Sequence, residues 1–288
     1  MKRILAIATT LFLSSIALGQ TSNLDSLIDV GNEQFESGEK NDALKTWQRI
    51  EESAPDTSST YGTVLGNILY FYIDEKNEIK AKEYFNRIFN SKLNDKDKRY
   101  NKLGEPFKNY RYHAAMSLAG YYANQKKYET ALNYVNLADN KIIYENTSLT
   151  AIKYQKVDLA FWKNRLYKDL GKPDSAFFVL VKRAFEYDYK NIYKNWATVS
   201  ASKDELELAE AILGSDSSRK IVTQLKSELD IALNALVTKH FNDADYVSFN
   251  LRNLRYDIRI YEKPGRIDDC KKYLEQSFFY QYLVGKTK

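Results

Sequence analysis

Apolar residues recur every three or four positions over most of the chain, and short polar segments interrupt this pattern. The clearest example covers residues 27–55, where apolar stretches at 27–35 and 43–50 flank a polar turn around Gly38. Such spacing places the apolar side chains on one face of a helix, so it predicts two amphipathic helices joined by a turn. Pro55 ends the second helix, because proline has no backbone N–H and disfavours helix in the residue before it.

The same two-helix pattern recurs further along the chain. In the second helix of each pair, an alanine is followed four residues later by a larger apolar residue. One pair cannot bury both of its apolar faces, so we expect neighbouring pairs to stack into a continuous core. The four pairs are expected at about residues 24–56, 61–93, 112–141 and 157–187, within a repeat region of residues 20–187, and their alanines are Ala43, Ala81, Ala131 and Ala176.

These helix pairs resemble the tetratricopeptide repeat (TPR), a helix–turn–helix unit of about 34 residues. In the first pair, Gly31, Ala43 and Trp47 stand at positions that define this family. The resemblance implies an all-α fold, a superhelical array of antiparallel helix hairpins known as an α-solenoid. The residues that define the repeat under this resemblance are Gly31, Ala43, Trp47, Tyr72, Ala81, Phe85, Tyr122, Ala131, Tyr167 and Ala176.

The remaining residues, 188–288, follow the helical pattern less closely. Apolar residues at spacings of three and four predict a helix over residues 220–241. Residues 250–284 fit a degenerate helix pair with a turn at Pro264 and Gly265. We find no alternation of apolar and polar residues long enough to predict a sheet. We therefore expect an all-α chain with a degenerate helical C-terminal region.

Residues 1–19 have the features of an export signal. Lys2 and Arg3 precede an apolar run at residues 4–18, which is shorter than the roughly 20 residues that span a bilayer. Small residues near its end predict cleavage after Gly19, with an uncleaved anchor helix as the alternative. We therefore expect a periplasmic or secreted bacterial protein without stable membrane insertion after cleavage.

Charge and composition argue against several function classes. The net charge is only +5, and basic residues alternate with acidic ones, which is typical of solvated helix faces rather than of nucleic-acid interfaces. The single cysteine, Cys270, cannot form an intrachain disulfide, and the two histidines, His113 and His240, belong to no metal-ligand motif. No phosphate-binding, metalloprotease or hydrolase motif occurs. We therefore expect no cofactor, no metal site, no nucleic-acid partner and no enzymatic activity.

The TPR resemblance also implies a binding groove on the concave face, formed mainly by the first helix of each pair. Asn32 and Asn67 match two asparagines of the carboxylate clamp with which some TPR domains hold peptide C-termini. Ile28, His113 and Ser117 stand where that clamp has cations, so we do not expect a clamp of this kind. The groove residues implied by the resemblance are Asn32, Asn67, Tyr70, His113, Phe161 and Arg165.

Three functions remain open at this point. The leading hypothesis is a non-enzymatic scaffold that binds a protein or peptide partner in the cell envelope on its concave face. The second is an envelope glycan or small-molecule binding protein that uses exposed aromatic side chains. The third is an enzyme on the same scaffold, which would need a cleft with converging carboxylates and shifted pKa values.

Overall fold

The computed structural model describes residues 24–94, 107–172, 219–241, 244–251 and 254–260, together with isolated positions at 175–183 and 271–285. The chain divides into two compact units, Met1–Ile152 and Lys153–Lys288. The predicted export signal and the predicted boundary at residue 187 lie outside the described residues.

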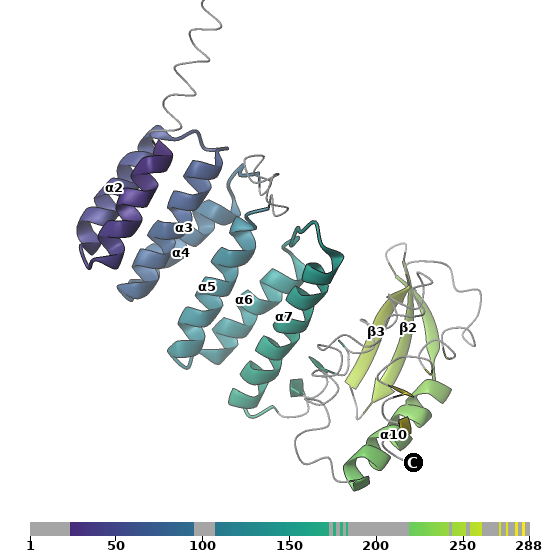
Figure 1. Ribbon diagram of the computed structural model, residues 1–288. Coiled ribbons are helices and arrows are strands. Elements are labelled where there is room, and N and C mark those ends of the chain that lie inside the picture. Colours follow the sequence, from purple (N-terminus) through teal and green to yellow (C-terminus); the bar gives the residue numbers. More distant parts are fainter. Residues whose placement is uncertain are drawn as a thin grey trace, which may run out of the picture. The chain divides into compact units, whose positions relative to one another are not determined.

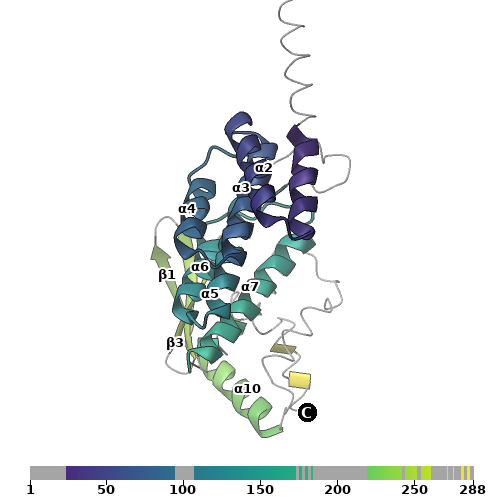
Figure 2. The same cartoon turned by 90° about the vertical axis from the view of Figure 1, so that its left-hand side faces the viewer.

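The first unit consists of helices that pack in sequential antiparallel pairs, as the views in Figure 1 and Figure 2 show. Each helix contacts the next one along the chain, and the first helices of the second and third pairs contact each other. This arrangement is that of a helical repeat array, and it confirms the predicted stack of helix pairs. The helices are residues 24–36, α2 (Lys40–Ser53), α3 (Ser59–Asp74), α4 (Glu78–Phe89), α5 (Tyr110–Asn124) and α6 (Tyr128–Asn140).

The turn inside each of the four pairs has the same backbone geometry. One residue has a positive φ angle, and it always lies five positions before the alanine of its pair. The next residue donates its N–H to the carbonyl oxygen five positions earlier, at 2.8 or 2.9 Å. This bond and the left-handed residue together close the C-terminus of a helix. The four residues are Gly38 (φ 91°), Lys76 (φ 55°), Lys126 (φ 59°) and Gly171 (φ 67°).

The core lies at the contacts between helices. The alanines Ala43, Ala81 and Ala131 have no exposed surface, and Ala176 in the second unit is 1% exposed. A residue of this size lets a neighbouring helix approach closely, so the interior can reach the density of protein cores. Of the residues expected to define the repeat, Gly31, Ala43, Trp47, Ala81, Phe85, Tyr122, Ala131 and Ala176 are buried, and Tyr72 and Tyr167 are half-buried.

The second unit contains helices and a sheet. Helix α7 (Leu149–Asp169) begins just before the unit boundary. Helix α10 (Arg219–Asn234), in which Leu229, Ala232 and Leu233 are buried, packs against the sheet (Figure 1). The sheet is antiparallel, with Val247 paired to Thr238 on one side and to Ile258 on the other. Its strands are β1 (Val237–Phe241), β2 (Ala244–Leu251) and β3 (Leu254–Ile260), in the order β1-β2-β3.

This sheet corrects the prediction for residues 237–260. The helix expected at 220–241 ends at Asn234, and the segment expected to begin a degenerate helix pair at 250–284 forms the end of β2 and the whole of β3. Residues 254–260 alternate apolar with charged residues (LRYDIRI). That period of two suits a strand and not a helix. The all-α prediction therefore holds for the helix pairs but not for these residues.

Candidate interaction surface

The predicted groove residues of the first unit lie on one face of the first helices. On α3 and α5 they belong to rows of residues at spacings of three and four, none of which is buried, whereas the other sides of both helices carry the core. We call this surface the first-helix face. It comprises Asn32 on the helix at residues 24–36, Thr63, Gly66, Asn67 and Tyr70 on α3, and His113, Met116, Ser117 and Gly120 on α5.

Asn32 and Asn67 are joined directly. Nδ2 of Asn67 donates a hydrogen bond of 2.8 Å to Oδ1 of Asn32, across 35 positions of sequence. The bond connects the first helices of two successive pairs. The Asn32 amide keeps its two N–H donors and the Asn67 amide keeps its oxygen acceptor, which are the groups that the main chain of an extended peptide can pair with.

Tyr70 offers an exposed aromatic ring on the same face. Its side chain is 57% exposed, and its ring meets Phe35 edge to face with centroids 6.0 Å apart. The ring centroid of Phe35 in turn lies 5.7 Å from that of the buried Trp47. Gly66, one helical turn before Tyr70, has no atom within 4 Å of the place where a Cβ would stand. Tyr70 is therefore held by the aromatic side chains on one side and has open space beside it.

His113 extends the first-helix face onto α5. It is exposed, and its ring lies 5.5 Å from that of Tyr112. Gly120, two turns further along α5, again has open space at its Cβ position. Among the residues that the structure describes, no group of three or more His, Cys, Asp or Glu side chains could hold a metal ion.

The other two predicted groove residues, Phe161 and Arg165, lie on α7 in the second unit. Arg165 is exposed, and its guanidinium carbon lies 4.1 Å from the ring centroid of Trp162. Asp158 is one turn before Trp162 and is exposed; partial desolvation of its carboxyl group by neighbouring atoms raises the pKa of that group, and Arg165 opposes that shift. The prediction omitted Trp162 and Asp158, although Asp158, Phe161, Trp162 and Arg165 follow the helical spacing of one face.

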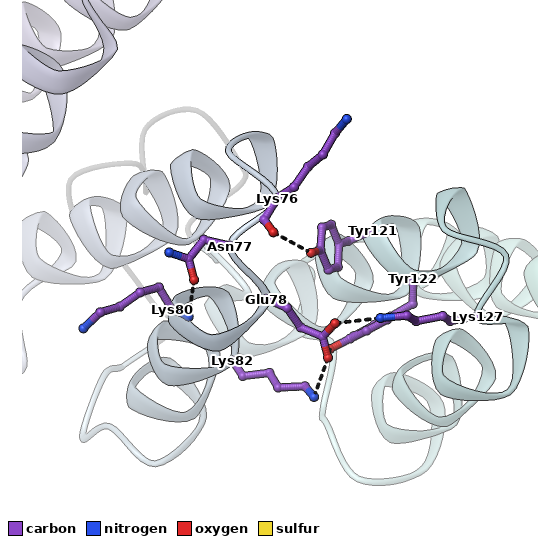
Figure 3. A network of polar contacts seen from close by, with 8 residues as sticks. All are labelled: Lys76, Asn77, Glu78, Lys80, Lys82, Tyr121, Tyr122 and Lys127. Atoms are coloured by element: carbon purple, nitrogen blue, oxygen red, sulfur yellow. Dashed lines mark hydrogen bonds and ion pairs between the residues drawn. The ribbon is translucent and has the colours of Figure 1, made fainter.

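A polar network fixes the second helix pair to the third (Figure 3). Glu78, at the start of α4, accepts hydrogen bonds from Lys127 at 2.7 Å, Lys82 at 2.8 Å and Tyr122 at 3.1 Å. These donors, Lys127 foremost, lower the pKa of Glu78 from 4.5 to about 2. Burial raises the pKa of Tyr122 to about 12. Beside this network, Tyr121 donates to the carbonyl oxygen of Lys76 at 3.2 Å.

The opposite end of the same two pairs is tied by Arg111. Its guanidinium donates to the carbonyl oxygens of Phe89, Ser91 and Leu93, at 3.2, 2.7 and 3.3 Å, just after the end of α4. Because both ends are fixed, the spacing of α3 and α5 on the first-helix face is set by the fold. A preorganised surface of this kind loses little entropy when a partner binds.

The described helices and the comparisons with known proteins give no further indication of function. Within the described ranges, no helix is both long enough and apolar enough to cross a bilayer. Comparisons of the chain with protein-family models, with curated proteins and with solved structures find no match. The surface itself is therefore the basis for assigning a function.

Proposed function

We propose that this protein is a non-enzymatic scaffold of the TPR type that binds a protein or peptide partner along its first-helix face. The observation that carries the proposal is the Asn32–Asn67 hydrogen bond beside the exposed ring of Tyr70. An extended peptide needs partners for its main-chain N–H and C=O groups and an apolar contact for its side chains. The two amides and the tyrosine supply both.

Repeated geometry supports the TPR assignment. Each of the four turns places its left-handed residue five positions before a buried alanine, and Gly31 lies against Trp47. A solenoid of such pairs offers a long continuous surface rather than a deep pocket, which suits a segment of a protein chain. The predicted export signal at residues 1–19 supports a scaffold that acts in the periplasm or outside the cell.

The test is crosslinking from the first-helix face. In the mature chain, residues 20–288, Tyr70 is replaced by the photoreactive amino acid p-benzoylphenylalanine, which keeps an aromatic ring at this site. The control carries the same amino acid at Ile79, which is 81% exposed but lies on α4, outside this face. Irradiation in an envelope extract of the source organism should give discrete crosslinked proteins from position 70 and none from position 79. No product from position 70, or the same products from both positions, would contradict the proposal.

A second candidate is a glycan-binding protein, and the exposed Tyr70 ring is the observation that favours it. Sugar rings stack on open aromatic faces, and the Asn32 and Asn67 amides would bind their hydroxyl groups. Calorimetric titration with chitohexaose distinguishes the glycan-binding protein from the protein-binding scaffold. Saturable binding that Tyr70→Ala abolishes, together with no crosslinked protein, would favour the glycan.

A further inference from the structure

Among the described residues, Arg165 on α7 has no carboxylate at ion-pair distance. In the described part of the chain it makes no ion pair, and its contacts are the stack on Trp162 and a longer-range interaction with Asp158. Lys40 and Lys127, in contrast, contact carboxylates at 2.5 and 2.7 Å. Arg165 therefore presents its charge to whatever approaches this face.

The stack on Trp162 also orients Arg165. A guanidinium that lies over an indole ring keeps N–H donors at its edge available. Those donors form a fork that matches the two oxygens of a carboxylate. Because the tryptophan already restricts the arginine side chain, pairing with a carboxylate loses less rotamer entropy than at a mobile surface arginine.

Aromatic side chains accompany Arg165 along the helix. Tyr154, Phe161 and Trp162 precede it by eleven, four and three positions, which places them on the same side of α7. Tyr154 is 48% exposed, and Phe161 and Trp162 are half-buried. A ligand bound to Arg165 thus meets an aromatic surface immediately beside the charge.

Asp158 limits the charge of that ligand. It lies two turns before Arg165, on the same face, and is exposed. A second carboxylate placed over Asp158 would be repelled, so a run of acidic residues does not suit this surface. A single carboxylate flanked by apolar side chains does.

We propose that this face of α7 binds an extended segment of a partner protein in which one glutamate or aspartate side chain pairs with Arg165 and an adjacent aromatic or apolar side chain lies against Phe161. The segment continues along the helix towards Tyr154. The inference rests on the proposed function, since it specifies the chemistry of a partner segment for the first helix of the fourth pair.

The experiment measures the preference for a carboxylate. A fluorescein-labelled peptide, Gly-Ser-Phe-Glu-Phe-Ser-Gly, and its Gln counterpart are titrated with the mature chain, and binding is followed by anisotropy. The Glu peptide should bind about tenfold more tightly, as a charge-assisted hydrogen bond at a partly exposed site provides. Arg165→Gln should abolish this preference. Arg49→Gln removes the same charge from an exposed position on α2 and should retain it.

Charge reversal makes the test specific. Arg165→Glu should bind the peptide with Lys in place of Glu more tightly than the Glu peptide, and circular dichroism should show the helix content of the unmodified chain. Trp162→Leu should reduce the Glu preference, because the guanidinium loses its support. Equal binding of the Glu and Gln peptides, no binding of either, or equal losses in Arg165→Gln and Arg49→Gln would overturn the inference.

The two proposals fail separately. Crosslinking from position 70 without a Glu preference would leave the scaffold function intact and remove the carboxylate recognition. A Glu preference that depends on Arg165, without crosslinking from position 70, would leave the carboxylate recognition intact and remove partner binding at the first-helix face. Binding of chitohexaose that depends on Trp162 but not on Arg165 would replace the inference with a glycan site.

Discussion

The indole of Trp47 lies so close to Gly31 that a Cβ atom at residue 31 would be 2.4 Å from Nε1 and 2.7 Å from Cδ1 of the ring. Trp47 comes from α2 and is 2% exposed, so its ring has little room to move. The glycine thus sets the distance between the two helices of the first pair.

Gly31→Ala should therefore destabilise the protein, by about 1–3 kcal/mol, because the added methyl group overpacks the contact with Trp47. The control is Gly66→Ala, also within a helix, where the new Cβ would have no neighbour within 4 Å. It should stabilise by up to about 1 kcal/mol, since alanine favours helix over glycine. Urea unfolding measures both. Equal shifts of the two midpoints would show that Trp47 moves freely.

The left-handed lysines of the turns give a second prediction. Lys76 and Lys126 have φ angles of 55° and 59°, which glycine adopts without the steric penalty of a Cβ. Lys76→Gly and Lys126→Gly should each stabilise by about 1 kcal/mol. Arg49→Gly, in the middle of α2, should destabilise by about as much. Differential scanning calorimetry of the three variants checks the signs, and a lower melting temperature for both lysine variants would contradict the turn geometry.

The third prediction concerns pH. The pKa of Glu78 is lowered from 4.5 to about 2 in the folded chain. Its ionised form therefore stabilises the fold above about pH 4.5, and this contribution is lost as the pH falls from 4.5 towards 2. The effect is small because the side chain is 33% exposed and water screens the pairs.

Glu78→Gln should lower the melting temperature at pH 7 by about 2–4 °C and flatten its fall between pH 4.5 and pH 2. Glu83→Gln removes an exposed pair with Lys80 and serves as the control, with a smaller change at pH 7. Melting curves by circular dichroism at pH 2.5, 4.5 and 7 supply the comparison. An unchanged pH dependence in Glu78→Gln would rule out the network as its source.

Asn109, just before α5, provides the fourth prediction. It is 4% exposed, has a φ of 48°, and exchanges two hydrogen bonds of 2.9 Å with the main chain of Glu145. Asn109→Gly keeps the backbone conformation but loses both bonds, at about 1–2 kcal/mol. Asn109→Ala should cost about 1 kcal/mol more, because a Cβ disfavours this conformation. Guanidinium unfolding should rank the stabilities Asn, Gly, Ala, and any other order would disagree with this account.

The fifth prediction tests a core contact between pairs. Phe85 is 5% exposed and meets Tyr134 of α6 edge to face, with centroids 5.2 Å apart. Phe85→Ala should destabilise by about 3–5 kcal/mol through the cavity it leaves. Ile79→Ala, at an 81% exposed position of the same helix, should change stability by less than about 0.5 kcal/mol. Hydrogen exchange of α4–α6 amides should accelerate in the first variant only.

The helix pairs could be predicted because each amphipathic helix repeats its pattern locally. Ala43, Ala81 and Ala131 were recognised from spacing alone, and all three are fully buried. The sheet was not predicted, because a local pattern does not show which strands pair. Apolar spacing that continues through α10 favoured a helix up to residue 241, while β3 shows its alternation over only seven residues. A strand that short becomes stable only when β2 pairs with it.

Sequence periodicity was thus sufficient to identify the helix pairs of the first unit and the small residues that lie between them, because both depend on neighbours three or four positions away. The Asn32–Asn67 bond, the stack of Arg165 on Trp162 and the left-handed Lys76 required the folded chain. A side chain's partner depends on how helices approach in space and on which rotamers that approach leaves open. The pattern along the chain therefore determines where the paired helices form, and only tertiary packing decides which side chains become partners.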